Sequence, residues 1–185
     1  SPPHGGVCAR LSGSRGLTGP TFDSPIRRPR LGGVFAVGPA EPFNRSSTMF
    51  TDDEIEAIAR GVIDRTLPKR DWTHAAHFAA AVWVLSRPEM DAARDMPGLI
   101  RAYNEATGVP NTDTDGYHET ITQASLRAAA AHLKPGAPLS EALAAILAGP
   151  CGRSDWLLAH WSKPRLFSVE ARRAWLDPDL QPLPF

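Results

Sequence analysis

From residue 49 onward, the apolar residues of the chain recur with the period of an α-helix, and each periodic segment ends close to a proline or a glycine. In the first segment, from Asp52 to Arg65, they fall at positions i, i+3, i+4, i+7 and i+8, which form one face of a helix. No segment alternates strictly between apolar and polar residues, so no strand is predicted. The pattern therefore predicts an all-α bundle of about six or seven helices.

The spacing of capping residues, prolines and glycines sets the expected helix boundaries. Helices are predicted over about 52–65, 73–86, 89–106, 117–133, 140–147, 154–161 and 168–175. Pro97 lies inside the third of these segments and is expected to kink or split it. Thr51 and Glu54 have the spacing of a capping box, so the first helix should begin at residue 52.

The first 48 residues differ from the rest of the chain in composition. They carry six Arg and two acidic residues, and 7 Pro with 8 Gly make up 15 of the 48 positions. This composition is typical of disordered sequence. We therefore predict a disordered Pro/Gly/Arg-rich leader over 1–48 and a helical metal-binding domain over 49–185. One interpretation is that Met49 is the natural start and the leader is upstream read-through.

The overall composition argues against several classes of partner. With 20 basic and 20 acidic residues the chain lacks the excess of positive charge that phosphate backbones require, so no nucleic-acid partner is expected. The longest uninterrupted apolar run, residues 78–85, is too short to cross a bilayer, so no membrane partner is expected. Two cysteines do not make a disulfide framework. These observations predict a cytoplasmic protein.

Four of the six histidines occupy helical positions that are expected to face the core. His74 and His77 precede the apolar positions of the second predicted helix by three or four residues. His118 shares a face of the fourth helix with apolar residues, and His160 follows Leu157 by three positions on the sixth. Several inward imidazoles on three helices raise the question of what satisfies their nitrogens.

Burying these imidazoles with hydrogen bonds alone requires partners for both nitrogens of each ring, whereas one metal ion can bind a nitrogen from several rings. The sequence leaves three interpretations open: a metal centre, a hydrogen-bonded acid–base pocket, or unrelated structural histidines. The leading one is a mononuclear centre held by His74, His77 and His118, with His160 as a further ligand. Such nitrogen-rich ligation suits a divalent transition metal, Zn, Fe, Ni or Cu.

The turn around His118 also supplies candidate catalytic groups. Glu119 follows His118 directly and points about 100° around the helix from it, where it could act as a general base. Tyr117 and Thr122 place hydroxyl groups around the same turn. We therefore predict Glu119, Tyr117 and Thr122 as catalytic residues beside the metal ligands.

Several short motifs resemble those of a family of small, largely uncharacterised bacterial all-α proteins. They are WTHAAH (72–77), YNEATG (103–108), GYHETIT (116–122), HWS (160–162), RLFS (165–168), EARRAW (170–175) and PDLQPLP (178–184). More loosely, a helical bundle with paired histidines and a distant third is similar to the DinB/YfiT group of metal-binding bundles. That group usually carries a His-x-x-x-His pair, whereas this chain has His-x-x-His. This resemblance implies metal binding.

Together these observations predict a metal-dependent enzyme that acts on a small-molecule substrate, as a hydrolase or an oxidoreductase. The alternative is a non-catalytic helical module that binds a metal, another ligand or a partner protein. No glycine-rich phosphate loop is present, so a nucleotide cofactor is not expected. A His-Glu-x-x-His zinc-protease motif is also missing, because Thr122 stands where its second histidine would be.

Overall fold

The computed structural model describes residues 49–185, and the predicted leader over 1–48 lies outside the described residues. Within that range the chain is all-helical, with seven α-helices, three short 3₁₀ helices and no strand. The all-α prediction is therefore confirmed. No helix between residues 49 and 185 combines the length and the apolar character needed to cross a membrane.

The first helix, α1 (Asp52–Ile63), begins where its capping signals place it. The Thr51 hydroxyl accepts a hydrogen bond from the Glu54 backbone N–H, and the Glu54 side chain accepts one from the Thr51 backbone in return. The predicted capping box is therefore present. The apolar face of α1 packs against the next long helix, α2 (His74–Leu85), after a 3₁₀ turn over Lys69–Asp71.

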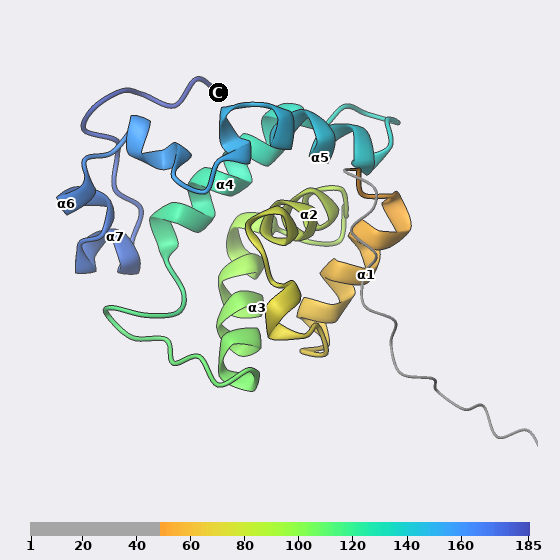
Figure 1. Cartoon of the computed structure of the whole chain (residues 1–185), viewed down its shortest axis with the longest axis horizontal. Coiled ribbons are helices and arrows are strands. Elements are labelled where there is room, and N and C mark those ends of the chain that lie inside the picture. Colours follow the sequence, from red (N-terminus) through yellow and green to blue (C-terminus); the bar gives the residue numbers. More distant parts are fainter. Residues whose placement is uncertain (1–48) are drawn as a thin grey trace, which may run out of the picture. The chain divides into compact units, whose positions relative to one another are not determined.

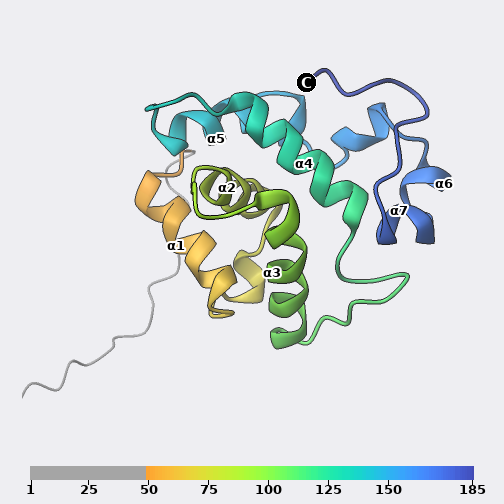
Figure 2. The same cartoon turned by 180° about the vertical axis from the view of Figure 1, so that it is seen from behind.

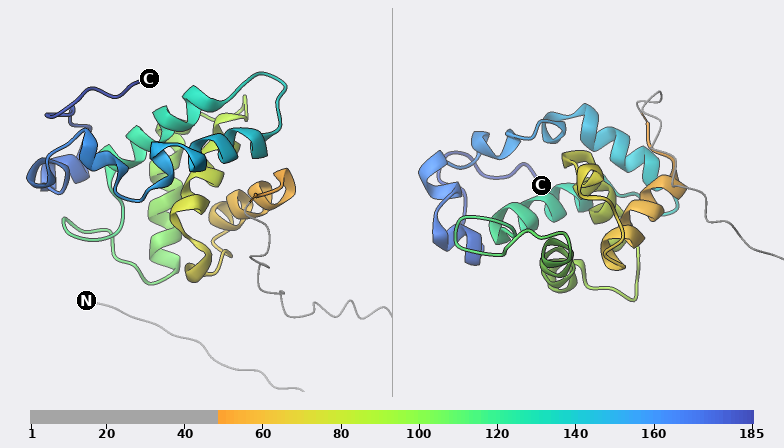
Figure 3. Two further views of the ribbon diagram at one scale, coloured as in Figure 1. Left: turned by 45° about the horizontal axis from the view of Figure 1, so that its top comes forward. Right: turned by 60° about the horizontal axis from the view of Figure 1, so that its bottom comes forward.

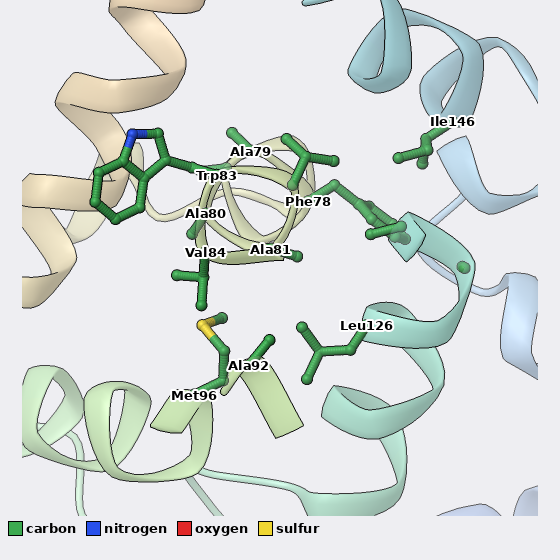
Figure 4. Packing of buried hydrophobic residues seen from close by; sticks show 14 of the residues in the cluster. Phe78, Ala79, Ala80, Ala81, Trp83, Val84, Ala92, Met96, Leu126 and Ile146 are labelled. Carbon is green, nitrogen blue, oxygen red and sulfur yellow. The ribbon is translucent and has the colours of Figure 1, made fainter. Parts of the chain in front are cut away.

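The helix α2 is the centre of the bundle. It contacts α1, α3 (Ala92–Ala106), α4 (Glu119–His132) and α5 (Leu139–Ala148), which surround it in Figures 1 and 2. Figure 4 shows Trp83 directed towards α1, while Met96 of α3, Leu126 of α4 and Ile146 of α5 approach α2 from other sides. Because nearly every residue from Phe78 to Val84 is buried, α2 has apolar residues on all its faces.

The helix α3 runs through Pro97 without breaking. Proline has no N–H, so the carbonyl of Ala93, four residues earlier, loses its partner within the helix. The side-chain amide of Gln123 on α4 donates to this carbonyl at 3.0 Å and to the Glu119 carboxylate at 2.9 Å. The helix is therefore not split at Pro97, and a side chain from α4 serves as substitute donor for the Ala93 carbonyl.

The replacement of the missing Pro97 N–H by the Gln123 amide can be tested with a double-mutant cycle. In the wild-type protein, Gln123→Ala should lower the free energy of unfolding by about 1 kcal/mol, because the Ala93 carbonyl loses its donor. In a Pro97→Ala background the backbone N–H at position 97 takes over, and Gln123→Ala should cost less. Urea denaturation of the four proteins measures the difference. If Gln123→Ala lowers the free energy of unfolding equally in both backgrounds, the Gln123 amide does not compensate for the missing N–H of Pro97.

The C-terminal third of the chain is made of short elements. After α5 come 3₁₀ turns over Pro150–Gly152 and Trp156–Ala159, then α6 (Lys163–Leu166) and α7 (Val169–Arg173). The helix α7 contacts α4, and the views in Figure 3 place α6 and α7 at the end of α4 away from α1. The helix predicted over 154–161 is therefore only one 3₁₀ turn, and α6 was not predicted.

Side-chain hydrogen bonds attach the extended C-terminal segment, residues 174–185, to the bundle. Thr120 on α4 donates to the Ala174 carbonyl at 2.8 Å and accepts from the Leu176 N–H at 3.1 Å. The Trp161 indole donates to the Leu176 carbonyl at 3.0 Å. These contacts hold the segment in place without regular secondary structure, as the prolines in this segment predict.

Candidate functional site

His74 and His77 lie in the first turn of α2, and each ring is held by a backbone carbonyl. His74 Nε2 donates to the Cys151 carbonyl at 2.8 Å, which joins α2 to the 3₁₀ turn after α5. His77 Nδ1 donates to the Thr73 carbonyl at 2.7 Å, and its ring stacks on Trp72 with centroids 3.8 Å apart. Each histidine of this pair therefore keeps one ring nitrogen without a described hydrogen bond.

Burial against the bundle keeps His77 neutral. Desolvation lowers the pKa of His77 to about 4, the hydrogen bond to Thr73 opposes that shift, and the nearby His74 adds to it. A histidine with a folded pKa below its unfolded value binds fewer protons in the folded state. The contribution of His77 to the free energy of unfolding is therefore fully present above about pH 6.5, and it is lost as the pH falls towards 4.

We therefore expect acid to destabilise the protein through His77. Between pH 6.5 and 4 the free energy of unfolding should fall by about 2–3 kcal/mol from this group, with the partial exposure of the ring taken into account. Proton NMR of the His77 Cε1–H should show a titration midpoint near 4. A midpoint at the ordinary histidine value would contradict the lowered pKa of His77. As a control, His77→Gln should remove the NMR signal and flatten the pH dependence of the free energy of unfolding.

His118 lies one residue before α4 and caps it, which corrects the expectation that it belongs to an inward helical face. Its Nδ1 accepts from the Ile121 N–H at 3.4 Å, and its Nε2 donates to the Leu166 carbonyl of α6 at 2.8 Å. Desolvation lowers the pKa of the buried His118, which keeps it in this neutral form. Both nitrogens are thus occupied by the protein backbone.

His160 lies at the end of a 3₁₀ turn and binds the C-terminal segment. Its Nδ1 is 3.1 Å from the carbonyl oxygens of both Gln181 and Pro182, and its own carbonyl accepts from the Leu180 N–H at 3.0 Å. The ring also packs edge-on against Trp156 and Trp161. His160 therefore anchors the last residues of the chain.

The four predicted metal ligands are not brought together as one set. Across residues 49–185 there is no group of three or more His, Cys, Asp or Glu side chains that could hold a metal ion. His74 and His77 are neighbours, whereas both nitrogens of His118 are engaged and His160 binds a different segment. The residues in this arrangement do not fit a mononuclear centre held by these four side chains.

The three predicted catalytic residues do form one hydrogen-bonded cluster. The Tyr117 hydroxyl donates to Glu119 Oε2 at 2.7 Å, and Thr122 also hydrogen-bonds this hydroxyl. Gln123 donates to the other carboxylate oxygen of Glu119. Burial of the ring raises the pKa of Tyr117 well above its ordinary value, and Glu119 raises it further. Tyr117 is therefore a neutral donor, and both oxygens of Glu119 have partners.

The loop before this cluster is closed by Gly116 and Asn111. Gly116 has φ +75°, and a Cβ there would collide with the Pro110 carbonyl and lie 2.8 Å from Asn111 Oδ1. Asn111 Oδ1 accepts from the Tyr117 N–H at 3.1 Å and from Asn104 at 3.0 Å. The loop is thereby fixed at one side of Tyr117.

Residues of this loop, α3 and α7 line an open pocket of about 240 Å³ beside Tyr117, which we call the arginine pocket. Its lining residues are Arg101, Asn111, Thr112, Asp113, Tyr117, Arg172 and Arg173. The Arg101 guanidinium lies over the Tyr117 ring, 4.1 Å from its centroid. Three guanidinium groups share this pocket with the single carboxylate of Asp113, so its formal charge is positive.

The hydrogen bonds of the lining leave arginine donors without partners. Arg172 Nη1 donates to the Gly116 and Tyr117 carbonyls, but its Nε is buried and has no partner. Arg173 binds Asp113 through Nε and Nη2 at 2.9 and 2.7 Å, which also satisfies the carboxylate. Arg101 makes no side-chain hydrogen bond within the described part of the chain. The accessible unengaged polar groups of this pocket are therefore guanidinium N–H donors of Arg101 and Arg173, because the Arg172 Nε is covered by protein atoms.

A second cavity, of about 260 Å³, lies between α4 and α5 and has different chemistry. Alanines provide much of its lining, together with His132, Lys134 and Glu141. Lys134 and Glu141 pair with each other at 2.9 Å, and His132 Nδ1 donates to the Ala128 carbonyl. Its charged groups already satisfy each other, so the arginine pocket is the better candidate site.

The sequence identified Tyr117 in this pocket but none of the arginines. Arg101 on α3 and Arg172 on α7 are far apart in the chain and belong to no motif with a fixed spacing. Only the adjacent pair Arg172-Arg173 in the last helix, after the Ser168 cap, offered a local signal.

Comparison with known proteins identifies no relative: no family model, curated protein or solved structure matches the chain.

Proposed function

We propose that this chain is a small-molecule-binding helical module whose arginine pocket holds an oxyanion. The observation that carries the proposal is that three arginines line one pocket with a single carboxylate, while Asp113 and Asn111 are satisfied by protein groups. The unmatched positive charge of this lining would repel a cationic ligand. An oxyanion accepts from the guanidinium donors and offsets the positive charge.

Arginine is well suited to this role because its planar fork matches the spacing of oxygens in carboxylate, sulfate and phosphate groups. Here the fork of Arg172 is oriented by two backbone carbonyls, so little side-chain freedom is lost on binding. The volume of about 240 Å³ lies below the usual range for drug-sized ligands, which favours a small anion.

Isothermal titration calorimetry with sodium sulfate at low ionic strength tests the proposal. The full chain should bind with one-to-one stoichiometry, and Arg101→Gln should weaken binding by about tenfold, because it removes one of three cations at the pocket. Arg101 is exposed and makes no side-chain hydrogen bond, so the variant should lose at most the cation–π contact with Tyr117, about 0.5–1 kcal/mol.

A matched control is Arg127→Gln. Arg127 is also an exposed arginine, stacked on an aromatic ring (Trp175, 3.6 Å), but it lies outside the pocket. This variant should bind sulfate as the wild type does. Equal weakening by both substitutions would show that only the net charge matters and would overturn the site.

The metal centre predicted from the sequence stays a prediction. The neighbouring pair His74 and His77, each fixed by a carbonyl at one nitrogen, has the kind of orientation that metal ligands show, but no third ligand joins it among residues 49–185. Metal analysis of the purified chain after exposure to Zn²⁺ or Fe²⁺ tests it. Stoichiometric metal that disappears in His74→Ala would support it, and no bound metal would exclude it.

A further inference from the structure

We infer that the ligand of the arginine pocket is the dianionic phosphate group of a small phosphate monoester, an inference that rests on the proposed anion site. Three guanidinium groups face one carboxylate in the lining, and that carboxylate is bound by Arg173 alone. Two positive charges therefore remain unmatched. A phosphate monoester carries close to two negative charges at neutral pH, whereas a carboxylate or a sulfate ester carries one.

The arginine donors come from three separate side chains, which favours a tetrahedral group over a planar one. Arg172 lines the pocket, Arg101 belongs to α3, and Arg173 keeps Nη1 after its two bonds to Asp113. Donors from two helices and three side chains thus surround one pocket. A carboxylate has two oxygens and is satisfied by a single fork, but a phosphate monoester has three terminal oxygens to distribute among three arginines.

The size of the pocket favours a small molecule rather than a macromolecule as the source of the phosphate. The pocket has a volume of about 240 Å³, and its cations come from three individual side chains and not from an extended basic surface. The described domain carries more acidic than basic residues, since 18 Asp and Glu stand against 14 Lys and Arg from residue 49 onward. The net negative charge of the described domain opposes the approach of a long polyanion.

Phenyl phosphate and phenyl sulfate provide a matched pair of probes, because both have a tetrahedral head on the same ring and differ in charge. Phenyl phosphate gains its second charge as the pH rises through about 6, while phenyl sulfate stays monoanionic. Calorimetric titrations of the full chain at pH 5 and 7.5 should show phenyl phosphate binding about tenfold more tightly at the higher pH. Phenyl sulfate should change by less than about twofold.

The phenyl sulfate titration also controls for ionisation of the protein. The charged groups facing the ligand are Arg101, Arg172, Arg173 and Asp113, with the Tyr117 phenol and its Glu119 partner behind them. A shift in any of them would alter the affinity for both probes together. Only the second ionisation of the ligand alters phenyl phosphate alone.

The titrations distinguish failure of the anion site from failure of the preference for a dianionic phosphate. Binding of both probes with equal affinity at pH 7.5, weakened by Arg101→Gln, would overturn the dianion and leave the anion site intact. Absence of binding for both probes and for sulfate would overturn the anion site itself. A phosphoserine peptide that binds more tightly than phenyl phosphate would contradict the small-molecule source.

Discussion

Replacing Thr120 with valine is expected to lower the free energy of unfolding by about 2–3 kcal/mol. Thr120 is fully buried, and its hydroxyl donates to the Ala174 carbonyl at 2.8 Å and accepts from the Leu176 N–H at 3.1 Å. Valine has nearly the same shape but no hydroxyl, so two backbone groups of the C-terminal segment would lose their partner. An unsatisfied buried polar group costs about 1–3 kcal/mol.

Urea denaturation measures this effect, and two further variants control it. Thr120→Ser keeps the hydroxyl and should lose much less stability than Thr120→Val. Thr66→Val makes the same chemical change at an exposed loop position whose side chain makes no described hydrogen bond, and should leave stability within about 0.5 kcal/mol. Equal losses for the serine and valine variants at position 120 would show that packing, not hydrogen bonding, decides the cost.

The second large effect is expected for Arg172→Gln, which should weaken anion binding by about a hundredfold. Arg172 lines the pocket with its guanidinium group and also supports the Gly116 and Tyr117 carbonyls of the neighbouring loop. Glutamine is too short to do both and carries no charge. Hydrogen bonds to charged groups contribute about 1.5–3 kcal/mol each, which corresponds to one or two orders of magnitude in affinity.

The matched control for this substitution is Arg165→Gln. Arg165 also donates to a backbone carbonyl, that of Asp177 at 2.8 Å, but it does not line the pocket. Both variants should lose about 1 kcal/mol of stability, while only Arg172→Gln should lose binding. Retained sulfate affinity in a folded Arg172→Gln protein would exclude Arg172 from the site.

Most of the helices could be predicted from the sequence because their signals are local. The capping box at Thr51 and the glycine at position 108 mark helix ends through hydrogen bonds and φ angles that depend on a few neighbouring residues. Pro97 misled the prediction because its compensation, the Gln123 amide, comes from another helix. The spacing of residues in the sequence does not indicate a hydrogen-bond partner that comes from another helix.

The four histidines were each predicted to lie on the inward face of a helix, whereas His118 is the N-cap of α4 and His160 ends a 3₁₀ turn. The first turn of α2 belongs to a helix that is apolar on all its faces, so the periodicity around His74 and His77 indicates burial but not a common direction. His118 is a cap, and capping geometry points a side chain back at its own backbone.

The proximity of Tyr117, Glu119 and Thr122 follows from the sequence because all three lie within about one and a half helical turns of each other, and their catalytic role stays a prediction. The arginine pocket could not be predicted in the same way. Its cations come from α3 and α7, which meet only through the fold of the intervening loop and α4.

The most direct test of the anion site is an NMR titration of the arginine Nε–Hε signals with phenyl phosphate at pH 7.5. We expect the Arg172 signal to shift and saturate, because its guanidinium group lines the pocket and responds to an anion bound there. The Arg127 signal, from an arginine outside the pocket, should not move. An unchanged Arg172 signal at saturating phenyl phosphate would contradict the account.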